Sequence, residues 1–133
     1  MGWEEELVKT AMEEKTRAYA PYSKFRVGAA VLTENGKIYT GANIENASFG
    51  ATICAERTAI IKAVSNGDLK IKAIAVSSDS EELIFPCGIC RQVLHEFGKH
   101  DTIILCSDNK GNFEAYTLGE LLPHDFKFLG VRT

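Results

Sequence analysis

The sequence contains no long hydrophobic run. Among its 133 residues, no stretch approaches the roughly 18 consecutive apolar residues that a membrane-spanning helix requires, so we expect no membrane partner. Runs of lysine or arginine are also missing, and 15 basic residues face 18 acidic ones, for a net charge of −3. Because proteins bind phosphate backbones through positively charged surfaces, this balance disfavours a nucleic-acid partner. The first six residues, MGWEEE, are acidic where a secretion signal is basic, and we therefore expect a cytoplasmic protein.

Linkers, repeats and low-complexity segments are equally lacking, and the chain has only 3 prolines. Its 45% hydrophobic and 25% charged residues are ordinary for a globular protein. Together these features predict a single domain over residues 1–133 with one core. A chain of this size leaves about a third of its unfolded surface exposed after folding, so an oligomer that covers more apolar area is compatible with its length.

Hydrophobic periodicity and turn signals predict an α/β protein. Helices are expected over residues 3–19, 52–65 and 88–97, and strands over residues 26–33, 37–40, 71–77, 102–106 and 113–117. The Asn35-Gly36 pair predicts a hairpin between the first two strands. The last two strands are joined by too short a link for a parallel crossover and should be antiparallel if they pair. This element order predicts a three-layer α/β/α sandwich around a five-stranded mixed sheet.

Cysteines occur only four times, and three of them fall where predicted helices begin. Cys54 opens one helix, and Cys87 and Cys90 flank the start of another, where a helix N-terminus lowers the pKa of a thiol. A catalytic zinc has three protein ligands and an open position, whereas a structural zinc usually has four. Cys106 ends an apolar strand and is interpreted as a buried small hydrophobe. The sequence therefore predicts a three-cysteine zinc site.

Two charged residues follow Cys54 closely. Glu56 lies in a segment apolar enough to be buried, and a buried carboxylate needs a reason such as a nearby metal or a proton-transfer task. Arg57 comes next, and a guanidinium that donates to a thiolate would reduce the electron density on the metal. Without Cys54, both side chains would be read as an exposed helix ion pair.

Motifs along almost the whole chain resemble the cytidine deaminase family. The segments are CAER at 54–57, PCGICRQ at 86–92, YSKFRVGAA at 22–30, GANIENA at 41–47 and LLP at 121–123. The paired zinc signature is similar to that of the small homotetrameric type with three cysteine ligands, and deaminases of this kind use a Glu that is not a ligand. Phe49 departs from the pattern, because several members of the family carry Tyr there.

The resemblance implies a zinc-dependent hydrolysis of free cytidine and deoxycytidine to uridine and deoxyuridine in pyrimidine salvage. It implies one Zn²⁺ per subunit on Cys54, Cys87 and Cys90, with Glu56 moving protons and Arg57 beside the ligands. It further implies substrate contacts from a second set of residues, namely Phe25, Asn43, Glu45, Ala55 and Phe126. Of these, Phe126 would come from a neighbouring subunit of a homotetramer, so that active sites lie at subunit interfaces. His95, His100 and His124 match no ligand position and are interpreted as helix-surface, turn and tail residues.

Other interpretations remain open. A nucleic-acid editing deaminase would share the zinc motif, although the acidic balance argues against it. A deaminase of modified nucleosides could use the same metal site, although Asn43 and Glu45 fit the pattern for ordinary cytidine. A non-enzymatic four-cysteine zinc domain would recruit Cys106, and a redox protein would use Cys87 and Cys90 alone. The redox alternative leaves Cys54 and Glu56 without a task.

Overall fold

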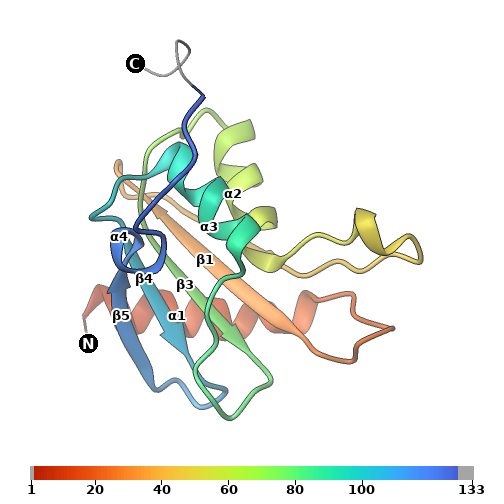
Figure 1. Ribbon diagram of the computed structural model, residues 1–133. Helices are drawn as coiled ribbons and strands as arrows, with labels where there is room; N and C mark the ends of the chain where they lie inside the picture. The colour runs from red at the N-terminus through yellow and green to blue at the C-terminus, as the bar shows by residue number, and fades with distance from the viewer. Residues whose placement is uncertain (1, 129–133) are drawn as a thin grey trace.

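The computed structural model describes residues 2–128 and shows one sheet with helices on both faces (Figure 1). The strands are β1 (Val27–Thr33), β2 (Ile38–Ala42), β3 (Ile71–Ser78), β4 (Ile103–Ser107) and β5 (Phe113–Thr117). The helices are α1 (Trp3–Glu14), α2 (Ala55–Ser65), α3 (Gly88–Phe97) and the short α4 (Leu118–Leu121), with 3-10 turns at Lys15–Arg17 and Phe49–Ala51. No helix among residues 2–128 is long and apolar enough to cross a membrane.

The sheet is mixed, with strand order β2-β1-β3-β4-β5. β1 is antiparallel to β2 and to β3, and β4 is antiparallel to β5. β3 and β4 are parallel, and α3 lies in the connection between them. The expected five-stranded mixed sheet and the antiparallel pairing of the last two strands are therefore confirmed.

Alternating residues along the central strands build a core on each face of the sheet. On one face, small residues let α1 approach closely: Leu7, Val8 and Ala11 pack on Ala30, Ala73, Ala75 and Leu105. On the other face, α2 and α3 cover larger side chains, and the cluster contains Ala59, Ile60, Leu94, Val31, Ile74, Ile104 and Cys106. Because side chains alternate across a strand, β1, β3 and β4 are apolar on both faces. The three-layer sandwich is confirmed.

Glycine allows α2 to lie unusually close to β2. A Cβ built on Gly41 would stand 2.5 Å from the backbone nitrogen of Ala59 and 2.7 Å from the carbonyl oxygen of Ala55. A side chain at this position would therefore collide with the helix backbone. The approach holds the first turn of α2 in place against the edge of the sheet.

Two predicted helix boundaries differ clearly from the structure. The first helix ends at Glu14 and continues as a 3-10 turn over Lys15–Arg17, so its expected end at residue 19 is wrong. The helix expected from residue 52 begins at Ala55, because Thr52 is extended and Ile53 pairs with Ile44 in an antiparallel bridge. Cys54 is thus the N-cap of α2 and not a residue of its first turn. The third helix, 88–97, and the fifth strand, 113–117, are confirmed.

Candidate active site

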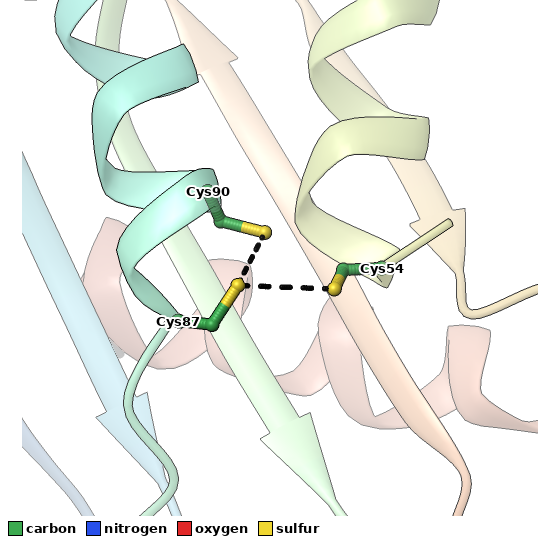
Figure 2. A group of neighbouring side chains, drawn as sticks. All are labelled: Cys54, Cys87 and Cys90. Atoms are coloured by element: carbon green, nitrogen blue, oxygen red, sulfur yellow. Dashed lines mark hydrogen bonds between the residues drawn. The ribbon is translucent and has the colours of Figure 1, made fainter. Parts of the chain in front are cut away.

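Three cysteines meet where two helices begin on the same face of the sheet. Cys54 is the N-cap of α2, Cys87 is the N-cap of α3, and Cys90 lies in the first turn of α3. Figure 2 shows the three side chains pointing toward one another from these two helices. The connections that precede the helices follow β2 and β3, so the cluster lies beyond the carboxyl ends of the two strands that flank β1.

The spacing of the sulfur atoms fits a single zinc ion. The Sγ atoms of Cys54 and Cys87 are 4.0 Å apart, and those of Cys87 and Cys90 are 3.5 Å apart. Tetrahedral zinc with bonds of about 2.3 Å places its sulfur ligands ~3.8 Å from one another. Three thiolates leave a fourth position open, as catalytic zinc requires. The donor set therefore fits the metal expected from the sequence.

The environment of the cluster favours a thiolate at Cys54. Hydrogen bonding to the Cys90 thiol lowers the pKa of Cys54 to about 5, and the Arg57 guanidinium adds to the effect. Arg57 Nη2 lies 3.6 Å from Cys54 Sγ. The paired Cys90 has its pKa raised, first by the hydrogen bond to Cys54 and then by burial. One proton is thus held between the two sulfurs, and an ion that binds both must displace it.

Glu56 is buried beside the cysteine cluster. Only 6% of the residue is exposed, and it lies in the first turn of α2, two residues after Cys54. Burial, together with the charge of Cys54, raises the pKa of its carboxyl group to about 7. A carboxyl group with such a pKa can both accept and donate a proton near neutral pH. Glu56 is therefore not part of an exposed ion pair with Arg57, which the sequence would suggest if Cys54 were absent.

Asn43 connects the start of β1 to the end of β2. Its side-chain Nδ2 donates to the carbonyl of Phe25 at 2.9 Å, and its Oδ1 accepts from the backbone N–H of Val27 at 2.9 Å. The residue is 9% exposed. An amide group has two N–H donors and two lone pairs, so these bonds leave one donor and one acceptor site for a ligand.

Glu45 is fixed by the turn that precedes β1. Its Oε1 accepts from the backbone N–H groups of Tyr22 and Ser23 at 3.0 and 3.1 Å, and the Ser23 hydroxyl donates to its other oxygen. The Ser23 hydroxyl, followed by the backbone donors, holds the pKa of Glu45 below its usual value. The carboxylate is therefore an oriented acceptor at neutral pH.

Two adjoining hollows contain these groups. One, of about 200 Å³, is lined by Val27, Asn43, Thr52, Ile53, Cys54, Ala55, Glu56, Ile84, Phe85 and Cys87. The other, of about 410 Å³, is lined by Tyr22, Ser23, Glu45, Phe49 and Thr52. Thr52 belongs to both. Because small-ligand sites usually enclose about 300–1,000 Å³, a ligand that reaches the cysteines would extend from the first hollow into the second.

The structure does not bring every expected substrate residue into these hollows. Phe25 is 38% exposed and Phe126 is 69% exposed, and neither is among the described residues that line the two hollows. Phe25 remains nearby through the bond from Asn43 to its carbonyl. Phe126 lies on the outer side of α3, where its backbone contacts Gln92.

Sequence reasoning missed some residues of the site and misplaced another. Thr52, Ile84 and Phe85 line the cysteine hollow, and the one available signal was the aromatic residue directly before the PCGIC motif. His95 was expected on a helix surface, but it is 4% exposed and its Nε2 lies 2.7 Å from Asp125 Oδ2. That expectation is wrong, because the carboxyl-terminal segment covers this part of α3.

Cys106 lies in the core, as its sequence context indicated. It is 0% exposed within the cluster between the sheet and α2 and α3, and burial raises the pKa of its thiol to about 12. The three-cysteine group found among residues 2–128 does not include it. A four-cysteine structural zinc site is therefore excluded by geometry.

Comparison with known proteins agrees with this geometry. Residues 1–106 match the family model described as the cytidine and deoxycytidylate deaminase zinc-binding region. The chain is 48% identical over 120 residues to the cytidine deaminase of Halalkalibacterium halodurans, covering 90% of this chain and 91% of that one. It is 48% identical over 122 residues to the cytidine deaminase of Sporosarcina psychrophila, covering 92% and 90%.

Solved structures show the same fold. The crystal structure of cytidine deaminase from Burkholderia pseudomallei matches with a TM-score of 0.87 at 42% identity, over 91% of this chain and 97% of that one. That of cytidine deaminase from Mycobacterium tuberculosis matches with a TM-score of 0.83 at 37% identity, over 96% and 99%. The described zinc-binding region includes all three clustered cysteines and Glu56. This chain therefore belongs to the zinc-dependent cytidine and deoxycytidylate deaminase family.

Proposed function

We propose that this chain, as a single domain over residues 1–133, hydrolyses the 4-amino group of free cytidine and deoxycytidine to give uridine, deoxyuridine and ammonia. The observation that carries the proposal is the burial of Glu56 in the same hollow as Cys54 and Cys87. A proton-transfer group beside a metal site with an open position is the arrangement that hydrolytic deamination requires.

In this proposal Cys54, Cys87 and Cys90 hold one Zn²⁺. When bound, the ion supplies Lewis acidity that lowers the pKa of a water molecule and so generates a nucleophile near neutral pH. Arg57 reduces the negative charge of the three sulfurs through its contact with Cys54 Sγ at 3.6 Å. The resulting site carries less excess negative charge, which favours deprotonation of water.

Glu56 moves the protons of the reaction. Its carboxylate accepts the proton of the attacking water and delivers it to N3 of the base, so that C4 becomes more electrophilic. The same group then takes the proton of the new C4 hydroxyl and donates it to the departing amino nitrogen, so that ammonia leaves and the C4 carbonyl forms. A pKa raised to about 7 by burial suits both tasks, because acid and base forms are both populated at neutral pH.

Substrate binding is assigned to the groups that surround the two hollows. The remaining amide donor of Asn43 and the oriented carboxylate of Glu45 suit the hydroxyl groups of a sugar. Ala55 is the first residue of α2, and backbone N–H groups at a helix start have no intrahelical acceptor, so that of Ala55 is available to the base. The backbone of Phe25 is bonded to Asn43, and its ring is assigned as an aromatic surface for a flat base.

The proposal includes a cytoplasmic homotetramer whose sites lie between subunits. Large hydrophobic side chains remain exposed near the hollows and on the tail, including Phe49 at 75% and Phe126 at 69%. Exposed aromatic residues of this kind are typical of interfaces, and the small cysteine hollow would be completed by a Phe126 ring from a neighbouring subunit. The four thiols are all free, which suits a reducing compartment.

The test is the fall in ultraviolet absorbance when the protein is mixed with cytidine, deoxycytidine or a single-stranded oligonucleotide. We expect turnover of both nucleosides but not of the oligonucleotide, and no turnover after zinc is removed. Glu56→Gln should retain one zinc per chain while kcat falls by about 10²–10⁴-fold, and Glu81→Gln at an exposed position serves as the matched control. Near-normal turnover by Glu56→Gln would disprove the assigned role.

A further inference from the structure

The carboxyl-terminal segment is attached to α3 by a side chain that the deamination chemistry does not use. Gln92 Nε2 donates to the carbonyl of Phe126 at 3.0 Å, and the backbone N–H of Phe126 donates to Gln92 Oε1 at 3.2 Å. One amide side chain thus satisfies both backbone groups of one residue, as a neighbouring strand would. These two bonds fix the backbone of Phe126 over the helix.

The preceding residue is anchored independently. Asp125 places Oδ1 3.1 Å from His100 Nε2 and Oδ2 2.7 Å from His95 Nε2. The side chains of His95 and Asp125 are 5% and 6% exposed, although His124 and Phe126 on either side of Asp125 are exposed. The hydrogen bond from His100 holds the pKa of Asp125 below its usual value. A carboxylate is buried in this way only where it is paired, so the contact is specific.

These contacts hold a residue whose own side chain remains in solvent. The Phe126 ring is exposed although its backbone is bonded on both sides. Ordering the segment costs conformational entropy, and within the chain this cost is not offset by burial of the ring. The anchoring therefore serves a contact outside the chain.

We propose that Gln92, His95, His100 and Asp125 are positioning residues that fix the Phe126 ring for substrate binding in a neighbouring subunit. The inference rests on the proposed function, in which that ring packs against the base. With the segment anchored, the ring is already in place when substrate arrives. Without these contacts, each binding event must order the segment again. The entropy cost of ordering one residue reduces the affinity for substrate by roughly tenfold.

The direct test measures KM and kcat for cytidine with Asp125→Ala and His100→Ala. Each variant should raise KM roughly tenfold and change kcat less than about twofold, with zinc content unchanged. The melting temperature should stay unchanged in His100→Ala, whereas Asp125→Ala removes the carboxylate beside buried His95 and should lower it. His100→Gln, whose amide nitrogen is as many bonds from the backbone as Nε2, should restore most of the affinity. His124→Ala, at the exposed neighbouring position, should behave as the parent does.

Mixed oligomers test whether the ring acts across subunits. A Glu56→Gln chain keeps the contacts that hold the Phe126 segment but has no proton-transfer group. An Asp125→Ala chain keeps Glu56 but lacks those contacts. Co-assembly of the two should produce sites with the parent KM, because an intact Phe126 segment then faces an intact Glu56. A mixture that shows only the raised KM would overturn action between subunits.

Three results would reject the positioning role, provided that the parent protein turns over cytidine. An unchanged KM in both alanine variants is one. A second is a fall in melting temperature with equal losses in kcat and affinity, which would indicate general structural damage. A third is a parent that binds two zinc ions per chain and loses one in His100→Ala, which would make His95, His100 and Asp125 metal ligands. A parent that is inactive on cytidine would instead overturn the proposed function itself.

Discussion

Replacement of Gly41 by alanine should disturb the metal site without touching any of its ligands. The added Cβ would lie 2.5 Å from the Ala59 nitrogen and 2.7 Å from the Ala55 oxygen, where ordinary contacts begin at 3.4 Å. These two atoms stand four residues apart in the first turn of α2, as the donor and acceptor of a helical hydrogen bond do. Helix and strand must therefore separate by about 0.9 Å at this point, or the bond must open.

The expected cost follows from overpacking a close contact. Inserting one methyl group into a well-packed core typically destabilises a protein by ~1–3 kcal/mol, and we expect a value near the middle of that range. The displacement also moves Cys54 and Glu56 on α2 relative to Cys87 and Cys90 on α3. Because sulfur–zinc bonds tolerate only about 0.2 Å of deviation, zinc affinity should fall together with stability.

Urea denaturation and competition with a chelator measure the two effects separately. Gly41→Ala should unfold at lower urea concentration and lose zinc at lower chelator concentration than the parent protein. Gly50→Ala is the matched control, because a Cβ there meets nothing within 4 Å. Parent-like values of both quantities for Gly41→Ala would refute the argument that this glycine sets the position of α2.

Three further substitutions probe the surroundings of the site. Cys106→Ser should destabilise the protein by ~1–3 kcal/mol, because a hydroxyl replaces a buried thiol, yet leave zinc content and kcat unchanged. Asp79→Asn should cost up to ~1 kcal/mol at pH 7, because Arg26 holds the pKa of Asp79 below its usual value. Thr117→Val should cost ~1 kcal/mol, because it removes the hydroxyl that caps α4 at the Glu120 N–H.

Each of these predictions has a distinct measurement. Metal analysis decides the Cys106 case, since zinc loss in Cys106→Ser would restore the four-cysteine alternative. Stability as a function of pH decides the Asp79 case. A depressed folded-state pKa contributes stability above the unfolded value of about 4 and loses it as pH falls further, so the two unfolding curves should converge below pH ~4. Urea denaturation decides the Thr117 case, and an unchanged midpoint would show that the cap contributes nothing.

The layered fold could be predicted because its signals are local. Short continuous apolar runs in β1 and β4, and the short link before β5, determine strands and their pairing. The start of α2 was misjudged because Thr52 is extended and Ile53 pairs with Ile44 in a bridge, and local hydrophobic periodicity does not show such a contact. The break after Glu14 has no strong sequence signal, since the chain carries no glycine or proline between Gly2 and Pro21.

The cysteine cluster was also predictable, because each ligand stands at a helix start that the sequence marks. Burial of Glu56 followed from the apolar residues around it. In contrast, the pairing of His95 with Asp125 depends on a contact between positions 30 residues apart that share no motif. Side chains that fold back on a helix from a distant tail leave no periodic pattern in the sequence, and only the structure shows them.

The three-sulfur site joins segments that are far apart in the chain. Cys54 and Cys87 are separated by 33 positions, and the whole of β3 lies between them. An ion bonded to both acts as a cross-link, and closing a loop of that length disfavours the unfolded chain by ~3.5 kcal/mol. That is a large share of the free energy of unfolding of a whole domain, which is roughly 5–15 kcal/mol. Cells starved of zinc would therefore lose this protein to degradation as well as to inactivity, so its abundance would follow the metal supply.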